Sequence, residues 1–155
     1  MTSTQNNTKF IFAAAFAVCA APAFAQSDAA SGDVAAGEEA FGQCVTCHVV
    51  ETPEGETLAG RNAKTGPNLY GVINQQAGLV EGFRYGKDLV KAGEDGLVWN
   101  EENFVAYVKD PTSFLREFTD NKRARSKMAN KVRKDEDAVN LYAYMLSLQP
   151  EAATN

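Results

Sequence analysis

Histidine and cysteine are scarce in this 155-residue chain, and their scarcity limits the chemistry that it can carry. The single histidine, His48, excludes any centre that needs two histidine ligands. A structural zinc site takes four cysteine or histidine ligands. The chain has three cysteines and one histidine, but Cys19 is lost with the leader described below, so too few ligands remain. Acidic side chains outnumber basic ones by 20 to 15, which disfavours nucleic acid as a partner. The chain also lacks the apolar run of about 20 residues that a membrane-spanning helix needs.

The remaining cysteines and the histidine stand together in the motif C-V-T-C-H, residues 44–48. Two cysteines three positions apart, followed directly by histidine, form the attachment signature of a c-type haem. On one helical turn Cys44 and Cys47 share a face, so both thiols can reach one haem edge, and His48 can reach the iron. A thioredoxin-like pair would need a βαβ surround, which the neighbouring sequence does not indicate, and a simple disulfide between the two cysteines remains an alternative. We therefore expect one covalently attached haem c.

Residues 1–25 are expected to be a cleaved secretory signal peptide. Lys9 precedes an apolar run from Phe10 to Ala21, and Ala-Phe-Ala at 23–25 is a cleavage site. A lipoprotein anchor at Cys19 is disfavoured, because the preceding residue is valine where a small residue is expected. Residues 26–155 are then a single domain. Export agrees with the haem interpretation and predicts a periplasmic location, because covalent haem attachment of this kind occurs outside the cytoplasm.

The charge is unevenly distributed. Residues 122–134, called the basic segment below, hold seven basic residues and no acid, whereas the rest of the expected mature chain holds seven bases against twenty acids. Such a surface would steer the molecule towards an acidic partner. A solvated loop without a partner is the alternative. The basic residues are Lys122, Arg123, Arg125, Lys127, Lys131, Arg133 and Lys134.

Local patterns predict a mainly helical chain. Asp33 can cap a helix that continues to the haem motif. Asn100 can cap a second helix, which stops at Asp110-Pro111. At the start of that helix, Trp99 can pack onto Phe104 as a hydrophobic staple. Glycines, prolines and polar residues mark 49–82 as loop. The other expectations are a short helix over 86–92, a brief turn over 112–118 and a final helix over 135–148 with a buried apolar stripe.

The second axial ligand of the iron is expected to be Met128. Met145 belongs to the apolar stripe of the final helix and is expected to pack in the core. Met128 lies instead in the basic segment, in no apolar period, eighty residues after His48. Its thioether suits haem iron. A free sixth site and a lysine ligand are the alternatives.

Several stretches together resemble class I c-type cytochromes, and closely the bacterial cytochrome c2 and c550 group. They are C-V-T-C-H (44–48), K-T-G-P-N-L-Y-G (64–71), W-N-E-E (99–102), Y-V-K-D-P (107–111), K-M (127–128) and A-Y-M (143–145). The resemblance covers nearly the whole mature chain. It implies an all-α fold in which the N- and C-terminal helices cross and long loops wrap one covalent haem.

The resemblance also implies roles for matching residues. Pro67 would accept a hydrogen bond from the haem-binding histidine, Tyr85 and Trp99 would donate to a haem propionate, and Tyr107 would approach the methionine sulfur. Gly37 and Phe41 would lie where the first helix crosses the last, at Leu141 and Tyr144.

Two departures from the family pattern stand out. Asn74-Gln75 replaces the usual Gly-Arg, so an arginine near a propionate is missing and the reduction potential does not carry over. The segment between Phe114 and Met128 is long, as in the large bacterial type.

The function implied is that of a soluble periplasmic electron carrier, not an enzyme. By resemblance, its partners would be membrane redox complexes: a bc1-type quinol–cytochrome c reductase as donor, and a photosynthetic reaction centre or terminal oxidase as acceptor. Docking through the basic segment would be transient, and the carrier would be a monomer. A haem enzyme or gas-binding protein with an open sixth site, and a subunit stably docked on a respiratory complex, are the competing interpretations.

Overall fold

The computed structural model describes Met1 and residues 30–150. Nearly all of the expected signal peptide, residues 2–25, therefore lies outside the described residues. The elements in chain order are α1 (Val34–Phe41), β1 (Val49–Glu51), β2 (Thr57–Gly60), α2 (Lys87–Glu94), α3 (Glu101–Lys109), α4 (Pro111–Phe118) and α5 (Asp135–Ser147). None of the helices formed by these residues combines the length and the apolar character needed to cross a bilayer.

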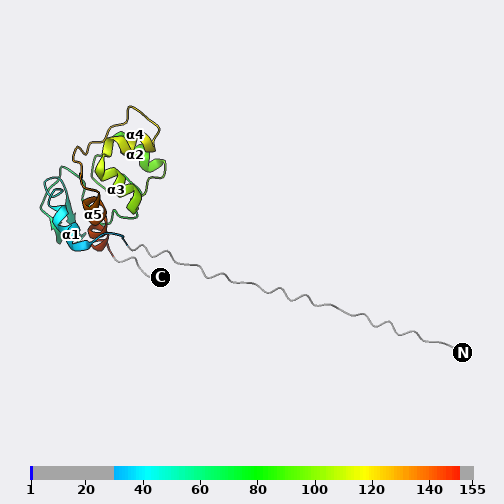
Figure 1. The fold of residues 1–155 in the computed structure, drawn as a ribbon, viewed down its shortest axis with the longest axis horizontal. Coiled ribbons are helices and arrows are strands. Elements are labelled where there is room, and N and C mark those ends of the chain that lie inside the picture. The colour runs from blue at the N-terminus through cyan, green and yellow to red at the C-terminus, as the bar shows by residue number, and fades with distance from the viewer. Residues whose placement is uncertain (2–29, 151–155) are drawn as a thin grey trace.

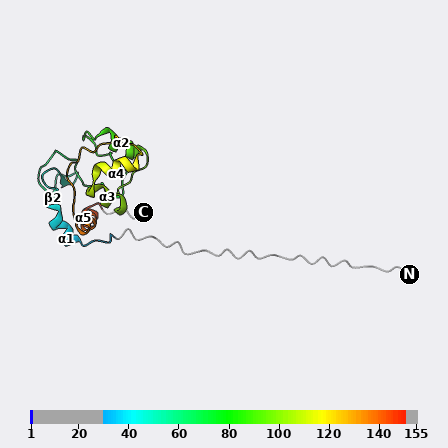
Figure 2. The ribbon, with the colours of Figure 1, turned by 45° about the horizontal axis from the view of Figure 1, so that its top comes forward.

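The crossing of α1 and α5 brings the two ends of the described chain together, as Figures 1 and 2 show. α1 starts at Asp33, whose carboxylate accepts a hydrogen bond from the Ala36 N–H at 2.7 Å. Gly37 faces α5 so closely that a Cβ there would overlap the carbonyl oxygen of Asn140 and lie 2.7 Å from the Cβ of Tyr144. The Phe41 and Tyr144 rings pack 5.6 Å apart between centroids. The predicted crossing at Gly37 is thus confirmed.

The remaining helices, α2, α3 and α4, gather on the other side of the molecule (Figure 1). α3 begins at Asn100, whose side chain accepts from the Asn103 N–H at 2.9 Å, as predicted. Asp110 ends α3 and also caps α4, accepting from the Ser113 N–H at 3.1 Å. α5 contacts both α1 and α3 and so joins the two halves. Its predicted apolar stripe is buried, with Met145 1% exposed.

α1 ends at Phe41, with two residues between it and the haem motif, and the motif lies on the turn that follows. Two local expectations were wrong. The expected loop over 49–82 contains an antiparallel hairpin, β1 and β2, with Val50 opposite Ala59. Residues 112–118, expected to form a brief turn, belong to the full helix α4. Pro111 is tolerated in the first turn of this helix, because an N–H group there has no partner within the helix.

Candidate functional site

The candidate site is a cavity of about 860 Å³ between the two halves of the molecule. That volume lies within the roughly 300–1,000 Å³ range of ligand and cofactor sites. Its wall includes the eight residues that the sequence analysis assigned to the haem site, which span more than 80 positions; Met145, assigned to the core, also lines it. The eight are Cys44, Cys47, His48, Pro67, Tyr85, Trp99, Tyr107 and Met128.

Cys44 and Cys47 are held by one helix-like turn. The Cys44 N–H donates to Phe41 O at 2.8 Å, and the N–H groups of Cys47 and His48 both donate to Cys44 O, at 3.1 and 3.0 Å. Cys44 and Cys47 form no disulfide within the described residues. Burial, with a smaller contribution from Cys47, raises the pKa of Cys44 from 9.0 to about 11, so that this thiol is protonated at neutral pH. The turn supplies the common face that a two-thioether attachment needs.

The imidazole of His48 is fixed by the loop opposite it. Its Nδ1 lies 3.0 Å from Pro67 O, and a Cβ on Gly66 would come within 2.6 Å of the same nitrogen. Burial lowers the pKa of His48, an effect that the bond to Pro67 partly opposes. A neutral ring that donates from Nδ1 to this carbonyl leaves the Nε2 lone pair free for a metal. Gly66 is therefore where the loop makes room for the ring.

Met128 enters the cavity from a segment without regular secondary structure, which is anchored by bonds to α3 and to the loop that carries Arg84. Ser126 Oγ accepts from the Met128 N–H at 3.0 Å and lies 3.0 Å from the Tyr107 hydroxyl on α3. Lys127 Nζ donates to Arg84 O at 2.7 Å, and the Val132 N–H donates to Val108 O at 2.9 Å. These bonds fix the course of the chain on both sides of Met128.

Aromatic side chains form much of the wall near Met128. The Trp99 and Tyr107 ring centroids lie 4.9 Å apart, and Phe114, which is not a lining residue, packs edge-on against Tyr107 at 5.8 Å. The expected staple of Trp99 onto Phe104 stays a prediction. Burial raises the pKa of Tyr107, so its hydroxyl is un-ionised at neutral pH. The approach of Tyr107 to the methionine sulfur stays a prediction, because the bond observed for this hydroxyl is to Ser126.

The two residues that depart from the family pattern lie beside Trp99 but outside the cavity wall. The Asn74 N–H donates to Trp99 O, and the Trp99 N–H donates to Gln75 O, both at 3.0 Å. Asn74 adopts a left-handed conformation with φ of 61°, and its side chain accepts from the Tyr142 hydroxyl at 3.2 Å. The Gln75 side chain is exposed. The main chain here supports Trp99.

All seven cations of the basic segment are exposed, but two of them are tied to the protein. Lys127 binds Arg84 O, and Lys131 pairs with Asp110 at 2.6 Å. The other five side chains have no hydrogen bond or ion pair with the described residues. Those five are Lys122, Arg123, Arg125, Arg133 and Lys134.

Apolar side chains complete the cavity, and sequence analysis did not place most of them there. Leu69, Val72 and Phe83 come from loops, and Leu89 and Val108 come from helix faces. Loop residues of this kind have no periodicity, so nothing in the sequence marks them as cavity wall. Sequence analysis also gave no role to Ser126, because Tyr107, whose hydroxyl it contacts, is 19 residues away in the chain.

The donors and the walls fit a haem. Two thiols on one turn, an imidazole and a thioether surround a space lined largely by apolar and aromatic side chains. This set provides two attachment points for one haem edge and two ligands suited to haem iron. Within residues 30–150, no three histidine, cysteine, aspartate or glutamate residues gather as a group that could hold a metal ion.

Comparison with known proteins gives a consistent result. The chain is 60% identical over 118 residues to a cytochrome c2 of Rhodovulum adriaticum, covering 76% of this chain and 94% of that protein. It is 52% identical over 134 residues to a cytochrome c2 of Cereibacter sphaeroides, covering 86% and 90%. A cytochrome c-550 of Paracoccus denitrificans is 37% identical over 135 residues, covering 86% and 83%. A scan against protein-family models found no match.

Solved structures agree with these relatives. The crystal structure of cytochrome c2 from Rhodobacter sphaeroides matches with a TM-score of 0.74 and 52% identity, over 75% of this chain and 95% of that chain. Ferric cytochrome c-550 from Paracoccus versutus matches with a TM-score of 0.72 and 37% identity, over 77% and 99%.

Proposed function

The chain belongs to the class I c-type cytochromes, among the bacterial cytochromes c2 and c-550, and is an electron carrier with one covalent haem c rather than an enzyme; we propose that Cys44 and Cys47 attach this haem and that His48 and Met128 bind its iron. The observation that carries the proposal is the single cavity whose wall holds the C-V-T-C-H turn and Met128. When bound, the haem supplies an iron that takes up and releases one electron at a potential raised by histidine–methionine ligation.

The protein groups around the haem hold it and limit access to it. Pro67 orients His48 and increases the basicity of its Nε2 through the bond at Nδ1. Tyr85 and Trp99 are proposed to donate to a propionate. The apolar and aromatic part of the wall would shield a bound haem from water, and His48 and Met128, if both bind its iron, would leave no coordination site for a substrate. No side chain is required to act as acid, base or nucleophile.

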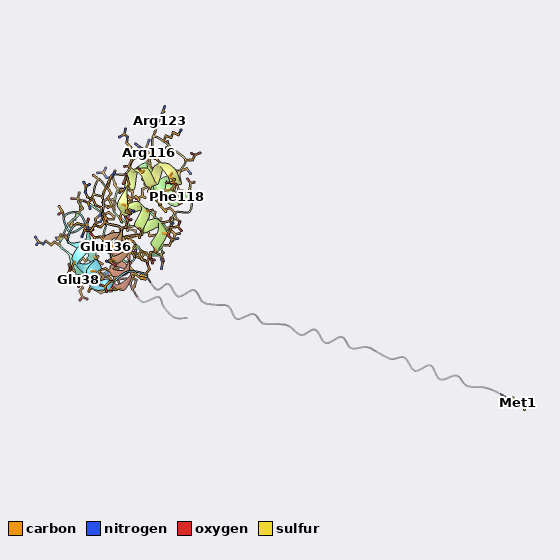
Figure 3. All side chains as sticks on the ribbon, in the orientation of Figure 1. Met1, Glu38, Arg116, Phe118, Arg123 and Glu136 are labelled. Carbon is orange, nitrogen blue, oxygen red and sulfur yellow. The ribbon has the colours of Figure 1, made fainter. Side chains whose placement is uncertain are left out.

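We propose that docking uses the free cations of the basic segment. The segment begins four residues beyond the end of α4, carries Met128 and continues to the start of α5. Figure 3 shows Arg116 and Arg123 at one end of the molecule and Glu38 and Glu136 at the other. Exposed cations of this kind can steer a molecule towards an acidic surface. Such redox encounters are small, transient and salt-sensitive.

We propose that this carrier acts in the periplasm after cleavage of residues 1–25. Its donor there would be a bc1-type quinol–cytochrome c reductase, and its acceptor a photosynthetic reaction centre or terminal oxidase. The sequence pattern of residues 1–25 and the family membership support this assignment.

The test is the rate of reduction of the oxidised protein by quinol-reduced bc1-type complex, measured by stopped flow at several salt concentrations. We expect the bimolecular rate constant to fall as salt rises. Arg123→Glu should slow association and flatten the salt dependence, whereas Arg61→Glu, the same charge change outside the basic segment, should do so much less. Equal effects of the two variants would contradict docking through the basic segment.

A further inference from the structure

We propose that the hydrogen bond from the Tyr142 hydroxyl to the Asn74 side chain positions Trp99 for its bond with a haem propionate. The proposal rests on the role of Trp99 as a propionate donor proposed above. Asn74 stands where the family commonly has glycine, so this contact does not come from the family pattern. Asn74 and Tyr142 are positioning residues, and together they are called the anchor pair below.

The main chain at residues 74 and 75 holds Trp99 on one side. The Asn74 N–H donates to Trp99 O, and the Trp99 N–H donates to Gln75 O, both at 3.0 Å. The same pairing continues with the Ala77 N–H, which donates to Leu97 O at 2.8 Å. Because two bonds join Trp99 directly to these residues, a shift of Asn74 would be passed on to Trp99.

The anchor pair ties an exposed loop residue to the core. Asn74 is exposed, and its φ of 61° lies in the left-handed region that L side chains seldom adopt. Its side-chain oxygen accepts from the Tyr142 hydroxyl at 3.2 Å, in partly buried surroundings. Tyr142 is 4% exposed on α5, and its ring packs 5.6 Å from that of Phe104 between centroids. The packed tyrosine therefore gives the loop a fixed point.

Other contacts near Trp99 keep the fold in place when the anchor pair is broken. The Ile73 N–H points to Gln149 Oε1 at 3.4 Å, a longer contact than that between Tyr142 and Asn74. From α3, Asn103 Nδ2 donates to Val98 O at 2.8 Å. Loss of the anchor pair should thus loosen one side of Trp99 without unfolding the protein.

The position of Trp99 bears on the reduction potential. Trp99 lines the cavity, and the indole N–H is the one donor that its side chain offers. A donor beside a propionate offsets part of the negative charge of that group. Hydrogen bonding around a haem is one of the levers on its potential, so a displaced donor should favour the ferric state and lower the potential.

The experiment follows Trp99 directly in the haem-loaded ferrous protein. The chain has one tryptophan, so a single indole N–H signal is expected in the proton NMR spectrum. Tyr142→Phe should speed the exchange of this N–H with solvent about tenfold, the factor expected for one net hydrogen bond. Tyr144→Phe is the matched control, because it makes the same change on α5 at a residue outside the cavity wall.

The reduction potential gives a second readout. Tyr142→Phe should lower it by about 30 mV, which corresponds to an about threefold shift of a one-electron equilibrium. In a Trp99→Phe background, the same change should leave the potential where Trp99→Phe alone puts it, because the donor is already gone. A general loosening of the fold would instead lower the potential in both backgrounds.

Asn74→Gly separates the side-chain bond from the backbone conformation. Glycine adopts a φ of 61° readily but offers no side-chain oxygen to Tyr142. We expect Asn74→Gly to match Tyr142→Phe in both readouts, and the double variant to add little. Wild-type exchange and potential in Asn74→Gly would overturn the proposal, and so would effects of Tyr142→Phe equal to those of Tyr144→Phe.

Failure of the donor role is recognised separately. A Trp99→Phe protein with the wild-type potential would refute the role of Trp99 and, with it, the function of the anchor pair. A Trp99→Phe protein with a lowered potential, together with a silent Tyr142→Phe variant, would leave the donor role standing and refute the anchor pair alone.

Discussion

The Nδ1 atom of His48 lies 3.0 Å from the carbonyl oxygen of Pro67, and Gly66 beside that proline allows this approach. The contact fixes the orientation of the imidazole and the nitrogen that faces the cavity. The loop that follows β2 therefore contributes to the proposed iron site without supplying a ligand.

Gly66→Ala should disturb this contact. The new Cβ would lie 2.6 Å from His48 Nδ1, so the ring or the loop must shift. We expect a lower free energy of unfolding, by about 1–3 kcal/mol as for other overpacked sites, and a changed reduction potential. Guanidinium titration and redox potentiometry of the haem-loaded protein measure the two effects. Wild-type values for both would contradict the assigned role of Gly66.

Gly37→Ala tests the helix crossing. Alanine is the better helix former by about 1 kcal/mol, so local propensity alone predicts stabilisation. The overlap of the new Cβ with Asn140 O opposes this, and overpacking of about 1–3 kcal/mol should win. Guanidinium unfolding should show a net loss of stability.

A matched variant on the exposed side of α1 isolates the propensity effect. Ala35→Gly should cost about 1 kcal/mol, with no change in packing. A Gly37→Ala protein more stable than wild type would show that the crossing is looser than described.

Asp110 should make stability depend on pH in the acid range. Its bond with Lys131, its bonds with Ser113 and the Lys131 charge lower the pKa of this exposed carboxyl from 3.8 to about 2. A carboxyl with a lowered folded-state pKa stabilises the fold above its unfolded pKa, and that contribution is lost as pH falls from about 4 to about 2.

The pH prediction is tested by comparing Asp110→Asn with wild type. Urea midpoints measured between pH 5 and pH 2 should converge for the two proteins as the pH falls. In a Lys131→Ala background, the pH-dependent difference in urea midpoint that Asp110→Asn produces should be smaller, because the Lys131 contact is the main cause of the lowered Asp110 pKa. A constant gap between wild type and Asp110→Asn across this range would contradict the prediction.

Short-range signals in the sequence were sufficient for the caps and the motif. Asp33 and Asn100 are followed by helices because their side chains bind N–H groups three residues on, which is a local event. The haem motif is likewise complete within five residues. The glycine at 37 indicated a close crossing because its cost in a helix needs a compensating contact.

The features that sequence analysis missed depend on distant contacts or on very short elements. β1 and β2 have three and four residues, too few to show an alternating pattern. The role of Ser126 appears only when α3 brings Tyr107 to it. Position in the fold also decides which cations are free, since Lys131 is paired by Asp110, 21 residues before it.

The central claim is that His48 and Met128 together fill the axial positions of the haem iron. The most direct measurement is the optical spectrum of the ferric, haem-loaded protein, compared with Met128→Ala and with Met145→Leu. We predict a weak far-red sulfur-to-iron charge-transfer band in wild type and in Met145→Leu, and its loss in Met128→Ala. A wild-type protein that lacks the band and binds carbon monoxide readily when reduced would contradict the account, because its sixth site would be open.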